Sequence, residues 1–362
     1  MEHAFGSSQP FTVGIEEELL LVARDTHGLS PVAADVLDAM HASERAASHE
    51  VYAAGIELRS PASETVAEAR RAVAGLRSSA AQAGATLMGV GLHPSASFGD
   101  AQLVETERYR LVEESMRGLV RRTPECALHV HVGLPDAEAA IRVFNGIRRH
   151  LPLLVALCAN SPLWFGADSG FASGRFSIVR SFPRRAVPRP FRDFAEYAEA
   201  IERTIAAGEL ADYTYIWWDA RLHPRLGTIE LREMDAQSRL EDVAAVAALV
   251  QSLSLYEAEE GSADWPPPEV IAEGSFRASR DGIAATILHD GEMRPVSEVA
   301  DITLNAVAPH ARAIGCDREL EWIEQIVREG GGAARQRAAL ARGGIEAVLA
   351  QLVSETMPGY TV

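Results

Sequence analysis

The chain has 362 residues, of which 47% are hydrophobic, and a formal net charge of -17 at pH 7. It is long enough to bury a large core, but it has neither the apolar run of a membrane span nor the pattern of a secretory signal. Its acidic charge argues against nucleic acids and anionic membranes as partners. Three scattered cysteines, Cys126, Cys158 and Cys316, favour free thiols in a reducing compartment. We therefore expect a cytoplasmic protein whose ligands are small molecules.

Hydrophobic periodicity predicts strands and helices in mixed order along the chain. In chain order we expect a strand at 11–22, a helix at 63–85 with Ser63 as its N-cap, a strand at 87–92, a helix at 108–122, a strand at 127–132, a helix at 136–160 broken near Pro152, a strand at 228–233, and helices at 240–257, 301–313, 319–329 and 345–355. The proline-rich run WPPPEV, at 265–270, is expected to be a loop.

Strict alternation of strands and crossover helices is absent, as is a glycine-rich phosphate-binding motif at the start of a helix. These features favour an α+β fold built on an antiparallel sheet. We expect a single domain over residues 1–362, with a helical C-terminal part from about residue 296.

Ionisable residues alternate with apolar ones in several strand-like stretches. In GIEEELLL, at 14–21, a strand would present Glu16 and Glu18 on one face and Glu17 on the other. The same alternation pairs Glu57 with Arg59, His129 with His131, and Glu230 with Arg232. A solvated face would also carry Ser, Thr or Gln, so one shared polar site is the more economical interpretation.

The residue types of this site indicate a cation. Several carboxylates with one or two imidazoles suit Mg²⁺ or Mn²⁺ better than a tetrahedral zinc site, although the two histidines alone would permit zinc. Arg59 and Arg232 have the forked geometry that binds phosphate, but pairing of each arginine with the glutamate of its own strand is an equally good interpretation.

Six motifs, in this order, resemble carboxylate-amine ligases of the glutamate-cysteine ligase type 2 family. They are GIEEELLL at 14–21, ELRSP at 57–61, RYR at 108–110, CALHVHVGLPD at 126–136, ANSPLWFGADSGFASGR at 159–175 and RLGTIELREMDAQ at 225–237. The later FRASRDG, at 276–282, is also similar to that family. The resemblance runs from about residue 12 to residue 252.

The resemblance implies a fold similar to the catalytic domain of glutamine synthetase, with an antiparallel sheet funnel flanked by helices. It implies ATP-dependent formation of an amide through an acyl phosphate, typically from the γ-carboxylate of glutamate and cysteine, with Mg²⁺ or Mn²⁺ as cofactor and a possible homo-oligomer. On this basis the metal ligands would be Glu16, Glu18, Glu57, His129 and Glu230. Phosphate or substrate carboxylate would be contacted by His131, Arg175 and Arg232, and the nucleotide by Arg59 and Arg232.

Three positions depart from the family pattern and bear on the choice of amine. Ala127 and Leu128 replace a glycine and a small polar residue, and Gly174 stands where the family often has an aromatic residue. Two alternatives to a ligase stay open, namely a zinc hydrolase that uses HVH and a non-catalytic nucleotide-binding homologue.

Other conspicuous residues have simpler interpretations. Cys126 is expected to be a buried structural thiol. The aromatic run TYIWWDAR, at 214–221, is expected to fill the core or a subunit contact rather than stack on adenine. The basic run at 180–192 is expected to be a solvated loop, with steering of anionic substrate as the second interpretation.

Overall fold

A seven-stranded antiparallel sheet forms the centre of the molecule in the computed structural model, which describes residues 1–262 and 264–359. Six strands follow the order β2-β3-β1-β5-β9-β8, and β4 pairs with β1 off this path. The strands are β1 (Val13–Leu21), β2 (Ala47–His49), β3 (Gly55–Arg59), β4 (Leu87–Met88), β5 (Ala127–Gly133), β8 (Ala220–His223) and β9 (Thr228–Asp235). Two hairpins lie outside this sheet, β6 (Leu163–Trp164) with β7 (Ala167–Asp168), and β10 (Thr286–His289) with β11 (Glu292–Pro295).

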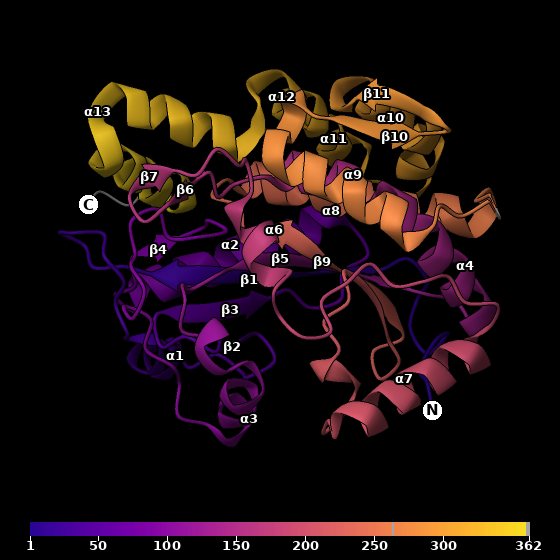
Figure 1. Ribbon diagram of the computed structural model, residues 1–362, viewed down its shortest axis with the longest axis horizontal. Helices are drawn as coiled ribbons and strands as arrows, with labels where there is room; N and C mark the ends of the chain where they lie inside the picture. The colour runs from indigo at the N-terminus through magenta and orange to yellow at the C-terminus, as the bar shows by residue number, and fades with distance from the viewer. Residues whose placement is uncertain (263, 360–362) are drawn as a thin grey trace.

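Helices cover the sheet on both sides. They are α1 (Ala33–Met40), α2 (Val66–Gln82), α3 (Glu107–Met116), α4 (Ala137–Ile147), α5 (Leu151–Cys158), α6 (Gly174–Val179), α7 (Phe194–Gly208), α8 (Leu240–Glu259), α9 (Pro268–Asp281), α10 (Val296–Ile314), α11 (Asp317–Leu320), α12 (Trp322–Glu329) and α13 (Gly331–Thr356). Figure 1 shows α9 to α13 gathered on one side, and α3 and α7 on the opposite side. None of the helices in the described ranges has the length and apolar character needed to cross a membrane.

The main core lies on one face of the sheet. Alternate residues of the central strands, among them Ile15, Val130 and Leu231, are fully buried there with the side chains of α4, α5 and α8. Helix α8 is buried on nearly all sides, which fits its continuous apolar sequence VAAVAALV. Because side chains alternate across a strand, the residues between these apolar ones project from the opposite face.

The predicted α+β fold class with an antiparallel sheet is confirmed. The strand expected at 87–92 is much shorter, because β4 ends at Met88. Beyond it the backbone runs against another segment rather than pairing as a strand, since a Cβ placed on Gly89 would lie 2.2 Å from the carbonyl oxygen of Gln237.

Helix boundaries differ from expectation where local hydrogen bonds compete. Ser63 is not the N-cap of α2, because it forms a β-bridge with Val13, and Thr65 caps the helix through a capping box with Glu68. The helix expected at 136–160 is two helices, separated by a 3₁₀ turn at Arg148–His150. The break precedes Pro152, which lies in the first turn of α5, where its missing N–H costs no hydrogen bond.

Three further expectations need correction. Helix α9 begins at Pro268, inside the run expected to be a loop, and α7 was not expected at all. The helix expected at 345–355 is the second half of α13, which is kinked at Gly343 and Gly344 by non-helical backbone angles.

Candidate active site

Strand β1 brings the acidic residues of three strands to one place. Glu16 lies opposite His129 of β5 and Arg59 of β3, and Glu18 lies opposite Glu57 of β3. The antiparallel register thus unites motifs that are more than a hundred residues apart in sequence.

Strand β9 completes this polar face through an irregular register. His131 lies opposite Glu230, but the pairing shifts beyond that point, since Val130 faces Leu231 while Leu128 faces Met234. The extra residue of β9 is a β-bulge, a feature that re-aims side chains next to functional sites.

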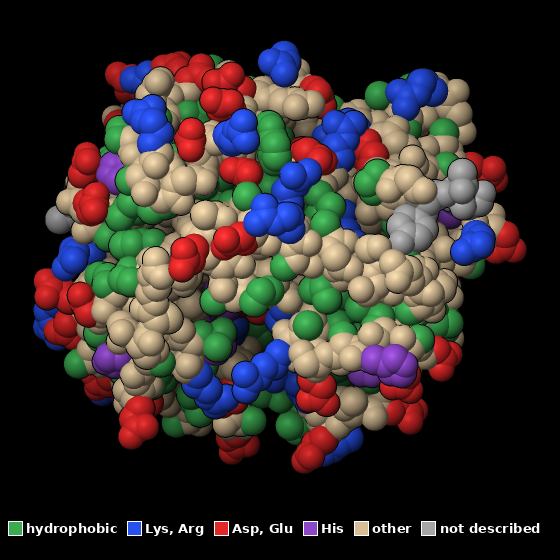
Figure 2. Space-filling model, turned by 180° about the vertical axis from the view of Figure 1, so that it is seen from behind, with side chains coloured by type: hydrophobic (Ala, Val, Ile, Leu, Met, Phe, Trp, Pro, Cys, Tyr) green, Lys and Arg blue, Asp and Glu red, His purple; other side chains and the backbone are tan. Residues whose placement is uncertain are grey.

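These residues line one pocket with a volume of about 840 Å³, within the range typical of small-molecule sites. All nine residues that the sequence assigns to the site line it: Glu16, Glu18, Glu57, Arg59, His129, His131, Arg175, Glu230 and Arg232. The chain contains no lysine, so its basic side chains are arginines and histidines. On the face seen in Figure 2, arginine side chains gather at the edge of a hollow.

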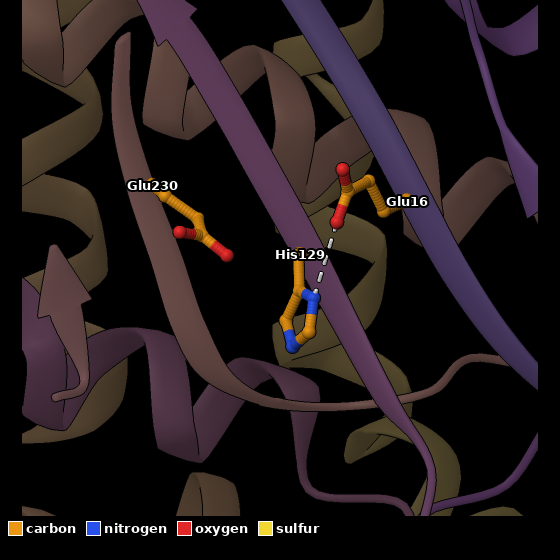
Figure 3. A group of neighbouring side chains, drawn as sticks. All are labelled: Glu16, His129 and Glu230. Carbon is orange, nitrogen blue, oxygen red and sulfur yellow. Dashed lines mark ion pairs between the residues drawn. The ribbon is translucent and has the colours of Figure 1, made fainter. Parts of the chain in front are cut away.

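Two groups of side chains in the described part of the chain have the spacing of cation ligands. Glu16, His129 and Glu230 form one group, and Glu18, Glu57 and His129 form the other, with ligand atoms within 4.8 Å of one another in each group. Figure 3 shows the first group converging from three neighbouring strands. The two groups share His129 and together contain all five residues that the sequence assigned to metal.

The imidazole of His129 is in the neutral form, which can bind a cation through a ring nitrogen. Burial, together with nearby Arg232, lowers the pKa of His129 to about 4, so the ring is neutral at pH 7. Its Nδ1 atom is buried without a hydrogen-bond partner and lies 3.5 Å from a carboxylate oxygen of Glu16. The Nε2 atom lies 3.7 Å from Glu18. A buried polar atom without a partner is costly unless a ligand satisfies it.

The carboxylates of the two groups have different electrostatic surroundings. Burial, with Glu50 and Glu125 nearby, raises the pKa of Glu18 well above its usual range. Burial also opposes the charge on Glu16, but His131 and His129 lower its pKa well below the usual range. A divalent cation would relieve the repulsion around Glu18.

Arginines neutralise the remaining carboxylates of the site. Arg221 lies 2.7 Å from Glu230, and Arg232 pairs with the same carboxylate. Arg59 pairs with Glu57. Without a ligand, Arg59 and Arg232 therefore pair with glutamates, as one of the two interpretations predicted. The same two side chains line the pocket, where they could instead bind phosphate when it is present.

Several residues of the pocket were not assigned to the site from the sequence, because they come from loops, from helix α3 and from the short strand β8, which was not predicted. They are Glu50, Arg108, Glu125, Arg185, Arg221 and His223. Burial raises the pKa of Glu50 to about 7, and Glu125 adds to this effect. Four of them had a signal in the sequence, since Arg108, Arg185 and Arg221 lie within stretches already singled out and Glu125 lies next to one.

The basic run at 180–192 is not simply a solvated loop. The side chain of Arg185 is only 6% exposed; its Nε atom lies 3.4 Å from Asp219, and it lines the pocket. Arg180 pairs with the same fully buried aspartate at 2.7 Å. The aromatic run divides similarly, because Trp217 lines the pocket while Trp218 packs against the core.

The three departures from the family pattern have structural counterparts. The backbone N–H of Ala127 donates to Glu18 at 2.6 Å, a bond that does not depend on the side chain, and Leu128 points into the core. Gly174 allows close packing, because a Cβ there would lie 3.0 Å from the carbonyl oxygen of Ser161. The thiol of Cys126 is buried among apolar residues, as expected.

Known proteins with similar sequences and folds identify the family. Residues 12–351 match the model of glutamate-cysteine ligase family 2. Two proteins of Rubrobacter xylanophilus, named "Putative glutamate--cysteine ligase 2-3" and "Putative glutamate--cysteine ligase 2-1", are 39% and 36% identical, with 98% and 99% of this chain and 100% and 98% of theirs covered. A glutamate-cysteine ligase of Francisella tularensis, solved in complex with AMP, has the same fold, with a TM-score of 0.73 at 13% identity over 96% of this chain and 89% of that one. The chain therefore belongs to glutamate-cysteine ligase family 2, a family of ligases that form carbon–nitrogen bonds.

Proposed function

We propose that this protein is an ATP-dependent carboxylate-amine ligase that joins the γ-carboxylate of glutamate to an amine, with cysteine as the first candidate. The observation that carries the proposal is the pair of cation-ligand groups that share His129, surrounded by arginines within one pocket. The names of the Rubrobacter relatives support the substrates, and the AMP bound to the Francisella protein supports use of a nucleotide.

The donor set fits a hard divalent cation. Glutamate oxygens outnumber imidazole nitrogens in both groups, which favours Mg²⁺ or Mn²⁺. Glu16, Glu18, Glu57, His129 and Glu230 would hold the ions. Bound there, they would neutralise and align the phosphates of ATP.

The arginines would then bind the anionic groups of the substrates. When cations take over the charge of Glu57 and Glu230, the guanidinium groups of Arg59 and Arg232 become available to phosphoryl oxygens. Arg175 and His131 would contact the phosphate or the substrate carboxylate. A carboxylate oxygen of the acid would attack the γ-phosphorus, releasing ADP and forming an acyl phosphate, which the amine would convert to the amide with release of phosphate.

Glu50 is suited to accept a proton from the amine. At pH 7 an aliphatic amine is mostly an ammonium ion, which cannot attack a carbonyl carbon. The pKa of Glu50, raised by burial to about 7, makes this carboxylate a proton acceptor near neutral pH. Its position in the wall of the same pocket supports this role.

The two alternatives are less well supported. A zinc hydrolase would use both histidines of HVH, but among the described residues His131 belongs to neither group of potential cation ligands. A non-catalytic nucleotide-binding homologue would also use the cation ligands, but it would have no need of Glu50, a proton acceptor with a pKa near 7 in the wall of the same pocket.

The test is ADP release by purified protein with Mg²⁺, ATP and glutamate, with and without cysteine, followed by a panel of amines and mass measurement of the product. The Glu16→Gln, Glu18→Gln double variant serves as the matched control. Amine-dependent ADP release with the mass of the amide establishes the ligase and its substrate. ATP-independent hydrolysis by zinc-loaded protein, without any amide, overturns the proposal.

A further inference from the structure

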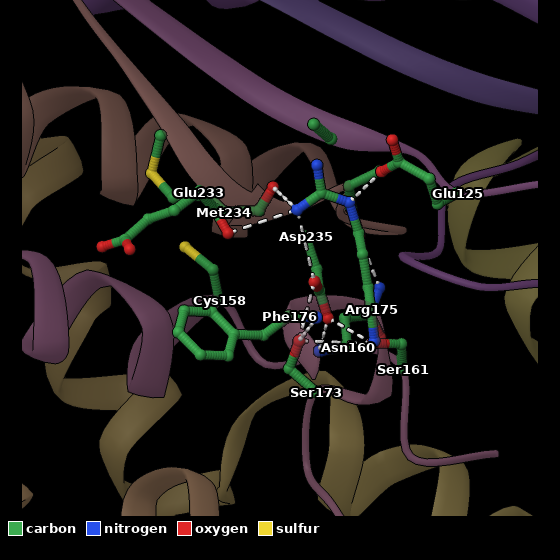
Figure 4. A network of polar contacts seen from close by, with 12 residues as sticks. Glu125, Cys158, Asn160, Ser161, Ser173, Arg175, Phe176, Glu233, Met234 and Asp235 are labelled. Carbon is green, nitrogen blue, oxygen red and sulfur yellow. Dashed lines mark hydrogen bonds and ion pairs between the residues drawn. The ribbon is translucent and has the colours of Figure 1, made fainter. Parts of the chain in front are cut away.

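Asp235, the last residue of β9, is buried behind the pocket and does not line it. Its Oδ2 atom accepts hydrogen bonds from the backbone N–H of Asn160 at 2.9 Å and from the hydroxyl of Ser161 at 2.6 Å. Its Oδ1 atom accepts from the hydroxyl of Ser173 at 2.9 Å. Three bonds to one buried carboxylate, drawn in Figure 4, form a rigid network in a region of low dielectric constant.

The same network holds both ends of Arg175. At the backbone end, the N–H of Arg175 donates to the hydroxyl of Ser161 at 3.1 Å, and Ser173 caps the short helix that begins at Gly174. At the side-chain end, the Nη1 atom of Arg175 lies 3.9 Å from Oδ1 of Asp235. The guanidinium is thus tied to the carboxylate that also orders its backbone.

Further contacts orient the guanidinium group towards the pocket. Its Nε atom donates to Glu125 at 2.5 Å, and Nη1 donates to the carbonyl oxygens of Glu233 and Met234 at 3.2 and 3.4 Å. These bonds use Nε and Nη1, so Nη2 is the nitrogen that we expect to meet an anion.

The carboxyl group of Asp235 packs closely against the backbone at Gly91. A Cβ placed on Gly91 would lie 2.6 Å from Cγ of Asp235, so the backbone of that segment is pressed against the carboxyl group. A residue larger than glycine at position 91 would therefore displace the carboxyl group.

We propose that Asp235 is a positioning residue, which acts through Ser161, Ser173 and Arg175 to hold the Arg175 guanidinium in the orientation that binds the substrate anion. The activity arm of this proposal rests on the proposed ligase function. An arginine side chain loses much conformational entropy when it is held in one orientation. If Arg175 is already ordered in the free protein, this entropy is not lost when the substrate binds. Asp235 itself touches no substrate.

The first experiment compares Asp235→Asn with the wild type. Asparagine keeps the shape but removes the negative charge and one acceptor, so kcat/KM for the acid should fall by about a hundredfold. The matched control is Asp242→Asn. Asp242 is another buried aspartate, whose carboxylate pairs with Arg335 at 2.7 Å. It does not line the pocket. The variant should retain kcat/KM to within about threefold.

A double-mutant cycle separates positioning from a merely structural role. If Asp235 acts through Arg175, the Asp235→Asn, Arg175→Lys double variant should be no slower than the slower single variant. Losses that multiply, or an Asp235→Asn variant with wild-type kcat/KM, overturn the proposal.

A measurement without turnover keeps this proposal distinct from the ligase assignment. The Nε–H resonance of Arg175, assigned with Arg175→Lys, should shift in the ¹H–¹⁵N spectrum of Asp235→Asn and stay in place in Asp242→Asn. An unchanged resonance overturns the proposal even if the protein is a ligase. If Asp235→Asn does not fold, Ser173→Ala, which removes one of the three bonds, replaces it with the same expected shift. Absence of ligase activity in the wild type would overturn the proposed function and leave the spectroscopic test in force.

Discussion

Adjacent glutamates of β1 lie on opposite faces of the sheet and have different partners. Glu17 is 1% exposed and faces the helices, where it accepts hydrogen bonds from Arg77 at 2.6 and 3.0 Å. Arg77 donates in addition to the backbone carbonyls of Gln237, Ser238 and Thr356. This carboxylate is satisfied within the chain, so its role is structural.

On the other face, Glu16 and Glu18 meet imidazoles and other carboxylates instead. Glu18 has Glu57 as its partner across the strands, and the nitrogen of His129 nearest to Glu16 has no hydrogen-bond partner. The difference shows how a ligand site can be distinguished from a buried ion pair. A buried charge whose hydrogen bonds are all made within the chain has a structural role. Buried polar atoms without a hydrogen-bond partner indicate a site that binds a ligand.

The strongest test of this contrast removes the charges on the pocket face. The Glu16→Gln, Glu18→Gln double variant should lower turnover by about a thousandfold or more, because the cation ligands are lost. Its melting temperature without metal should be equal to or above that of the wild type, since repulsion around Glu18 is relieved. Unchanged turnover with Mg²⁺ and ATP would sink the assignment of this face as the metal site.

The second test concerns Glu50. Glu50→Gln should lower kcat by about a hundred- to ten-thousandfold, the range typical of a lost general base, while calorimetry shows nearly unchanged affinity for Mg·ATP. In the wild type, kcat/KM for the amine should rise with pH, pass its half-maximal value near pH 7 and level off above it, because the carboxylate must lose its proton before it can accept one. A variant with the wild-type pH profile would contradict the role.

The third test breaks the structural side of the comparison. Arg77→Met leaves the charge of Glu17 buried without a partner and should lower the free energy of unfolding by about 3–5 kcal/mol, measured by urea denaturation. The Glu17→Leu, Arg77→Met double variant should recover most of this loss. Because neither residue lines the pocket, kcat of the folded protein should stay within about twofold of the wild type.

The smallest effect is a pH dependence of stability without metal. The pKa of Glu50 in the folded state, about 7, exceeds the value of about 4.3 for an unfolded glutamate. The folded state therefore binds more protons between these two values, and its stability falls as the pH rises through that window. Between pH 5 and 7 the melting temperature of Glu50→Gln should therefore fall by about 3 °C less than that of the wild type. Equal slopes for the two proteins would refute the assignment of the raised pKa to Glu50.

The sequence contains much of this site because strands have a simple period. Glu16 and Glu18, His129 and His131, and Glu230 and Arg232 each alternate with apolar residues, so one face of each strand could be predicted without knowing its neighbours. The same alternation set Glu17 apart as the residue needing a structural explanation, and Arg77 supplies it.

Two predictions from the sequence were wrong for the same reason, namely that contacts with distant residues override the local preference of the backbone. Ser63 is a good capping residue, but its backbone pairs with Val13, so Thr65 takes the cap. Residues beyond Met88 have the composition of a strand, but their backbone is pressed against another segment. Short-range propensity cannot foresee such contacts.

The α+β class, the polar faces of the central strands and the family could all be predicted from the amino-acid sequence, because periodicity and ordered motifs are properties of the chain. Which carboxylates share a cation site could be seen only in the folded chain, since that depends on the register of four strands and on the bulge between Leu231 and Met234. The folded chain also shows that Glu50, Arg108 and Arg185 reach the pocket. Their positions follow from where loops and helices pack, and packing is settled by contacts between residues distant in sequence.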